Sequence, residues 1–173
     1  MNQTINLYSL RYSQIKTYLF GALFVAGNIV LPQLCHLIPF GSHNGGQILL
    51  PIYFFTLIAA YKYGFSVGLL TALLSPLCNY LLFGMPAAHM LPVLIVKSAL
   101  LALAAAFAAH YFKNISFIGI LLAVLAYQII GTGVEYLLSG SAVAAFQDFR
   151  VGVPGMLLQI AGGYFVLKAI ARK

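Results

Sequence analysis

The sequence predicts an all-α fold, an integral membrane bundle of six transmembrane helices with both termini in the cytoplasm. Of the 173 residues, 62% are hydrophobic and only 6% are charged, whereas about 25% of the residues of a soluble domain are charged. Such a chain cannot face water on all sides, so lipid must cover most of its surface. The long apolar runs lack the two-residue alternation of barrel strands, which favours helices.

Six apolar segments come close to the roughly 20 residues that a helix needs to cross a bilayer, and the second is the shortest. A polar segment of about residues 1–16 precedes them and is expected in the cytoplasm. No short apolar core with a small-residue cleavage site follows it, so we expect the first span to stay in the protein. The expected spans, which make residues 1–173 a single membrane domain, are residues 18–38, 47–61, 64–83, 90–111, 115–138 and 151–170.

The cations predict the orientation of these spans. The chain has nine Lys and Arg residues, of which Lys97 lies within the fourth span and Arg150 in a loop on the side opposite the termini. The other seven all fall on the side of the termini if the spans alternate in direction. The positive-inside rule then predicts cytoplasmic termini in a multi-pass protein of the cell (inner) membrane. These loop cations account for the net charge of +7, so we expect no nucleic acid as a partner.

Polar and sulfur-containing residues gather at the opposite, outer end. The stretch "SPLCNYLLFGMPAAHM", residues 75–90, combines prolines, methionines, a cysteine, an asparagine, a tyrosine and a histidine in an otherwise apolar chain. Polar groups at membrane depth usually face a cavity or another helix, so we expect a binding site that opens to the outside. The candidate ligand-binding residues are Asn28, His36, His43, Asn44, Gln47, Cys78, Asn79, Tyr80, His89, Lys97, Tyr127 and Glu135.

Two charged residues, Lys97 and Glu135, lie inside predicted spans, where a charge is costly unless it is paired or functional. They can pair with each other and hold two helices together. Alternatively, Lys97 can bind a carboxylate or phosphate of a ligand, and we favour a mixed role at the floor of the pocket. Asp148 and Arg150 are expected at the rim of the mouth, where they can pair with each other.

This pattern of length, six spans and cytoplasmic termini resembles the substrate-binding S components of energy-coupling-factor (ECF) vitamin transporters. The first span contains "FGALFVAG", in which Ala22 and Ala26 are spaced to let another helix approach closely. In that family such a face docks the transmembrane coupling subunit, whereas packing inside the bundle is the alternative. The segment "LIPFGSHNGGQILLPIYFF" looks like the family's first outer loop, which gates the pocket.

The resemblance implies a high-affinity binding subunit that takes up a vitamin or related micronutrient with a coupling subunit and two ATPase subunits. Cobalamin is one possible ligand, because a cysteine ligand to corrinoid cobalt is a known variant of the family. Cys78 is a candidate metal ligand only in that case, and otherwise a small buried side chain. A disulfide between Cys35 and Cys78 also stays open. Asn2 stands where nickel and cobalt-ion relatives have a histidine, which argues against uptake of a free metal ion.

We expect no enzymatic activity and no cofactor bound to this chain. It has no Gly-x-x-x-x-Gly-Lys-Ser/Thr phosphate loop, so ATP hydrolysis would come from partner subunits. Glu135 and Asp148 are its only carboxylates, which leaves little room for acid–base catalysis by paired carboxylates. An intramembrane enzyme or a structural membrane protein is the alternative function.

Overall fold

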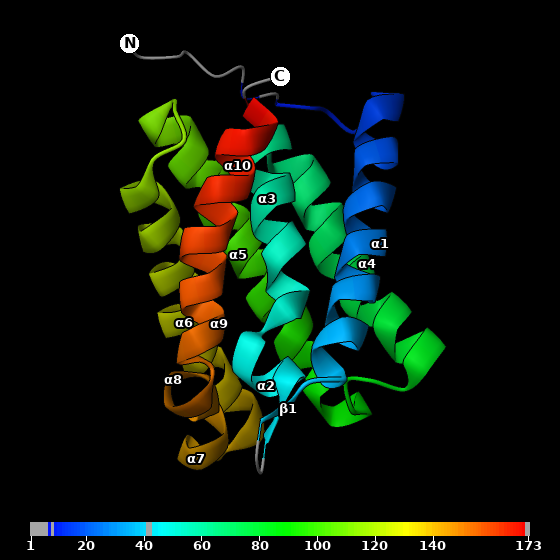
Figure 1. The fold of residues 1–173 in the computed structure, drawn as a ribbon, viewed down its shortest axis with the longest axis vertical. Coiled ribbons are helices and arrows are strands. Elements are labelled where there is room, and N and C mark those ends of the chain that lie inside the picture. Colours follow the sequence, from blue (N-terminus) through cyan, green and yellow to red (C-terminus); the bar gives the residue numbers. More distant parts are fainter. Residues whose placement is uncertain (1–6, 8, 41–42, 172–173) are drawn as a thin grey trace.

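The computed structural model describes residues 7, 9–40 and 43–171, with the backbone alone for residues 39, 40, 43 and 44. In this part of the chain, long helices pack side by side into one bundle (Figure 1). Five helical segments are long and apolar enough to cross a membrane. They are Ile15–His36, Phe65–Phe83, Ala88–Phe112, Phe117–Ser139 and Val153–Ala171.

The first four segments are α1 (Ile15–His36), α4 (Phe65–Phe83), η2 (Ala88–Met90) with α5 (Leu91–Phe112), and α6 (Phe117–Ser139). The fifth segment is built from three consecutive helical elements. These three elements are α9 (Val153–Leu157), the π-helical turn η3 (Leu158–Gly162) and α10 (Gly163–Ala171). Their outer faces carry large exposed side chains such as Leu23, Leu81 and Leu137. Apolar side chains on the outside of a helical bundle are typical of surfaces that contact lipid.

The second expected span, residues 47–61, is not one continuous helix, so the structure gives five candidate spans instead of six. It is divided into α2 (Gly45–Leu49), the 3₁₀ turn η1 (Pro51–Tyr53) and α3 (Phe54–Tyr63). The break falls at Leu50, whose φ of 46° lies in the left-handed region, next to Pro51. The residue before a proline is disfavoured in the α region, which explains why the helix ends there.

The helix α3 lies in the centre of the bundle, where α1, α4 and α5 pack around it (Figure 1). Its residues from Leu57 to Tyr61 are at most 1% exposed. A broken helix is tolerated at membrane depth only where protein surrounds it or where it lines a cavity. The central position therefore explains how this segment can be short and interrupted.

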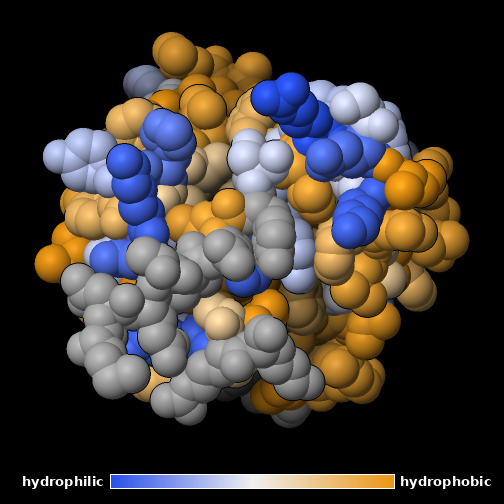
Figure 2. Space-filling view, turned by 90° about the horizontal axis from the view of Figure 1, so that it is seen from above, coloured by the Kyte–Doolittle hydropathy of each residue, from blue (hydrophilic) through white to orange (hydrophobic). Residues whose placement is uncertain are grey.

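The two ends of the bundle differ in character. The helix α1 begins and α10 ends at the same end (Figure 1), where the turns after α3 and α5 also lie. Seen onto this end, groups of hydrophilic side chains lie among apolar ones (Figure 2). The opposite end carries the short strands β1 (Pro39–Phe40) and β2 (His43–Asn44), α7 (Ala142–Ala145) and α8 (Gln147–Val151).

Candidate ligand-binding site

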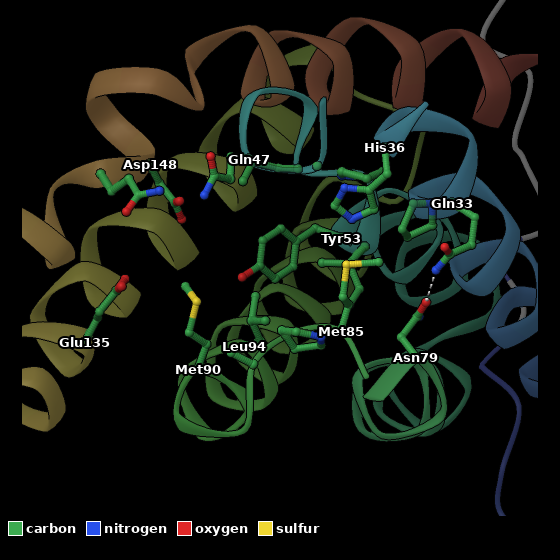
Figure 3. Close-up of a pocket in the computed structure, with 18 residues that line it drawn as sticks. Gln33, His36, Gln47, Tyr53, Asn79, Met85, Met90, Leu94, Glu135 and Asp148 are labelled. Carbon is green, nitrogen blue, oxygen red and sulfur yellow. Dashed lines mark hydrogen bonds between the residues drawn. The ribbon is translucent and has the colours of Figure 1, made fainter. Parts of the chain in front are cut away.

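A cavity of about 250 Å³ lies at the end of the bundle that carries the β1–β2 hairpin and α8. Side chains from α1, α2, η1, α4, α5, α6 and α8 converge on it, so segments from most of the chain contribute (Figure 3). The lining residues are Pro32, Gln33, His36, Gly46, Gln47, Leu50, Pro51, Ile52, Tyr53, Asn79, Met85, Pro86, Ala87, Met90, Leu94, Glu135, Gln147 and Asp148.

The break between α2 and η1 forms one wall of this cavity. A hydrogen-bonded chain supports it from behind: Tyr127 Oη donates to Gln159 Oε1 at 3.0 Å, and Gln159 Nε2 donates to the Leu50 carbonyl at 3.5 Å. Gln159 lies in the π-helical turn η3. Such turns occur mostly as local insertions in α-helices, frequently at functional sites. The side chains of Tyr127 and Gln159 therefore fix the wall instead of entering the cavity.

Tyr53 is the buried polar side chain that this wall turns toward the cavity. The residue is 1% exposed, and its hydroxyl has no hydrogen-bond partner among the described residues. Its ring packs against Tyr127 with 5.3 Å between ring centroids. The hydroxyl points toward the side of the cavity where Glu135 and Asp148 lie (Figure 3). A buried hydroxyl without a partner costs about 1–3 kcal/mol, so a ligand group that bonded it would recover that cost.

A buried charge cluster forms the polar side of the cavity. The Lys97 ammonium donates to Glu135 Oε2 and, at 2.8 Å, to Asp148 Oδ2. The predicted pairing of Lys97 with Glu135 is confirmed. The predicted pairing of Asp148 with Arg150 is wrong, because Asp148 on α8 pairs with Lys97 on α5, while Arg150 is exposed.

The charges of this cluster are arranged in layers. The Lys97 side chain is 2% exposed, against 11% for Glu135 and 19% for Asp148. The stem of Lys97 passes directly over Gly131, where a Cβ atom would lie 2.7 Å from Lys97 Cγ. Glycine at this position lets the ammonium sit behind the two carboxylates. The carboxylates line the cavity and the ammonium does not, so a ligand meets acceptors here.

The structure brings together only some of the residues that the sequence suggested for binding. His36, Gln47, Asn79 and Glu135 line the cavity. Lys97 supports Glu135 from behind, and Tyr127 supports Tyr53. Cys78, Tyr80 and His89 do not line the cavity: the first two are half-buried on α4, and His89 is exposed in η2. The side chains of His43 and Asn44 lie outside the described part of the chain.

Asn28 belongs to the framework of the bundle and not to the cavity. It is fully buried, and its Nδ2 donates to Thr56 Oγ1 at 3.0 Å and to Ser75 Oγ at 3.2 Å. Its Oδ1 accepts from the backbone N–H of Phe55 at 3.2 Å, in the first turn of α3, where helix donors have no intrahelical partner. Asn28 therefore ties α1 to α3 and α4, and it caps α3 from a neighbouring helix.

Asn79 lies at the boundary between this framework and the cavity. Its Nδ2 donates to the carbonyls of Asn28 and Ser75, both at 2.9 Å. Its Oδ1 accepts from Gln33 Nε2 at 3.4 Å (Figure 3). Both ends of the amide are thus engaged within the protein, which makes Asn79 a part of the cavity wall that also holds α1 and α4 together.

The remaining predicted features lie away from the cavity. Ala22 and Ala26 are both exposed on α1, which does not fit the alternative that they pack inside the bundle. Cys35 and Cys78 are free thiols, so no disulfide joins them. Asp148 was expected only at the rim of the mouth, and Tyr53 was expected at most to stack on a planar ring and not to offer its hydroxyl. The rarity of carboxylates was a signal for Asp148, whereas the orientation of Tyr53 depends on the helix break at Leu50.

No protein-family model matches the chain, and no curated protein and no solved structure matches it either. The fold and the site together define a helical protein with membrane-type spans and, at one end, a largely apolar cavity with a few polar groups.

Proposed function

We propose that the chain is the membrane-embedded binding subunit of an uptake system for a small vitamin or related micronutrient. It would act with an ECF coupling subunit and two ATPase subunits, as the resemblance of the sequence implies. The observation that carries the proposal is the Tyr53 hydroxyl, which has no hydrogen-bond partner in the described part of the chain and faces a cavity with convergent polar groups. A largely apolar cavity with a few convergent polar groups is the usual form of a small-molecule site.

A compact ligand fits this cavity better than a corrinoid. Pockets for drug-sized molecules have volumes of about 300–1,000 Å³, whereas this one has about 250 Å³. Cys78, the candidate cobalt ligand, does not line it. We therefore propose a small micronutrient and not cobalamin.

Mass spectrometry of the purified protein tests this function. The full chain, expressed in rich medium and purified in detergent, is expected to retain a small molecule in about one-to-one ratio. Retention would exclude a purely structural role. Chemical conversion of that compound by the purified chain alone would instead favour the alternative of an intramembrane enzyme.

The Tyr53 hydroxyl provides a test that separates binding from folding. Tyr53→Phe is expected to weaken binding of the retained compound about fivefold, since one net hydrogen bond contributes about 1 kcal/mol. The free energy of unfolding should not fall, because the hydroxyl has no partner among the described residues. Tyr127→Phe is the matched control: it removes the bond to Gln159, so it should lower stability by about 1 kcal/mol. Lower stability in Tyr53→Phe together with weaker binding in Tyr127→Phe would contradict the proposal.

The orientation in the membrane follows from the positive-inside rule, with the cavity end outside. In a variant with Cys35→Ala and Cys78→Ala, a membrane-impermeant maleimide should label Ser139→Cys but not Lys113→Cys in intact cells. Both positions are exposed and lie at opposite ends of the bundle. Permeabilised cells, in which both should react, provide the control. Labelling of position 113 alone in intact cells would reverse the orientation.

The exposed alanines of α1 are the proposed docking face for the coupling subunit. Ala22→Leu combined with Ala26→Leu should abolish co-purification of that subunit, because added bulk separates helices that need close approach. Retention of the small molecule should be unchanged. Gly133→Leu, which adds bulk to an exposed site on α6 with open space around it, is the control. If both variants still assemble, docking uses another face.

A further inference from the structure

We propose that the cavity selects a small organic cation with N–H donors, and this inference rests on the proposed function as a ligand-binding subunit. The first observation is the charge balance. Lys97, Glu135 and Asp148 carry one positive and two negative charges, so the cluster has a net charge of −1 when both carboxylates are ionised. Lys97 is the only cation in contact with them among the described residues.

The order of these charges decides what a ligand meets. The ammonium of Lys97 is enclosed behind the carboxylates, and none of the described residues that line the cavity is a Lys or an Arg. A ligand carboxylate or phosphate would therefore approach Glu135 and Asp148 before it could reach Lys97. Like charges at such close range in a poorly solvated site repel strongly. The geometry thus disfavours the anionic ligand that the sequence left open for Lys97.

The hydrogen-bonding capacity of the cluster is only partly used. Lys97 bonds Glu135 through Oε2 and Asp148 through Oδ2. The other oxygen of each carboxylate accepts no hydrogen bond from the described residues. An ionised carboxylate can only accept, and both residues line the cavity, so each keeps one oxygen to which a ligand N–H can donate. Bonds between a cationic N–H and a carboxylate are shorter and about twice as strong as those between neutral groups.

Tyr53 supplies the second, independent observation. Its buried hydroxyl, which no other described residue bonds, points toward the side of the cavity where the carboxylates lie (Figure 3). Met85, Met90 and Leu94 add an apolar surface around it. Thioethers are polarisable and pack well against aromatic rings. The ligand is therefore a cationic nitrogen group directed at Glu135 and Asp148, carried on a compact apolar or aromatic body.

Three molecules of nearly equal shape test this selection: benzamidinium, benzamide and benzoate. The purified full chain in lipid nanodiscs, freed of any retained compound, is titrated with each at neutral pH by calorimetry and ligand-observed NMR. Benzamidinium should bind about tenfold more tightly than benzamide, because its bonds to carboxylates are charge-assisted. Benzoate should show no binding.

Two variants assign the preference to the cluster. Asp148→Asn and Glu135→Gln each leave Lys97 one carboxylate partner, and each should bring the affinities for benzamidinium and benzamide close to equality. Val143→Lys changes the net charge by the same amount at an exposed site on α7 and should leave the preference intact.

The outcomes separate this inference from the proposed function. Binding of benzoate as tight as that of benzamidinium, no binding of any probe at millimolar concentration, or an unchanged preference in both variants would overturn the cation selection. Retention of an anionic or neutral micronutrient would also overturn it while supporting the proposed function. Cation-selective binding of the probes, with no micronutrient retained or transported, would support the selectivity and remove the uptake role.

Discussion

Replacing Lys97 with methionine is expected to lower the free energy of unfolding by about 3 kcal/mol, at the lower end of the range for breaking a buried ion pair. The variant leaves Glu135 and Asp148 side by side without the ammonium that bonds both of them. Their partial exposure to the cavity, 11% and 19%, places the cost at that lower end. Reversible unfolding in mixed micelles, followed by circular dichroism, measures the change.

A triple variant distinguishes loss of charge balance from loss of packing. Lys97→Met combined with Glu135→Gln and Asp148→Asn removes all three charges at nearly constant volume, and it should recover most of the lost stability. Removing all the charges together leaves no uncompensated buried charge, which is the main cost when one partner alone is removed. If Lys97→Met alone is as stable as the parent chain, the three groups do not depend on one another for stability.

Asn28→Leu is expected to cost about 3 kcal/mol of stability, because it leaves several buried partners unsatisfied at once. The partners that lose their bond are the hydroxyls of Thr56 and Ser75 and the first-turn N–H of Phe55. Gln33→Leu on the same helix is the matched control, since Gln33 makes one long bond of 3.4 Å to Asn79. It should cost less than about 1 kcal/mol.

The variants Asn28→Leu and Gln33→Leu also test whether Asn28 belongs to the framework of the bundle or to the cavity. Asn28 does not line the cavity, so ligand affinity per folded molecule should be unchanged in Asn28→Leu. Thermal unfolding and ligand titration on the same preparations provide both quantities. A large loss of affinity with unchanged stability would show that Asn28 belongs to the binding site, as the sequence first suggested.

Much of the architecture could be predicted from composition and spacing, because lipid imposes simple rules on a chain. The helices at residues 18–38, 64–83, 90–111, 115–138 and 151–170 were expected within a few residues of those observed. Hydrophobic length determines such spans, whichever neighbours they later contact. The second segment differed because a helix covered by other helices needs neither the length nor the continuity of one that faces lipid.

The site was less predictable, because side-chain roles depend on contacts between segments that are distant in the sequence. The sequence could show that Lys97 and Glu135 were costly at membrane depth and needed partners. It could not show that Asp148, after α6 and α7, folds back to share the same ammonium. Nor could it show that Cys78 does not line the cavity while Asn79, the next residue, does.

The sequence by itself thus determined that lipid surrounds most of the chain, where the spans approximately lie, and at which end the cations gather. Each of these depends on the sum of local contributions to the free energy of transfer into the membrane. The tertiary structure alone decided which polar residues hold the bundle together and which face the cavity. Asn28 and Tyr53 illustrate the difference. Both are buried polar residues, but the Asn28 amide finds its hydrogen-bond partners within the bundle, whereas the Tyr53 hydroxyl has none among the described residues. The physical reason is that a buried polar group must find its partner in three dimensions, and only packing determines whether that partner is protein or ligand.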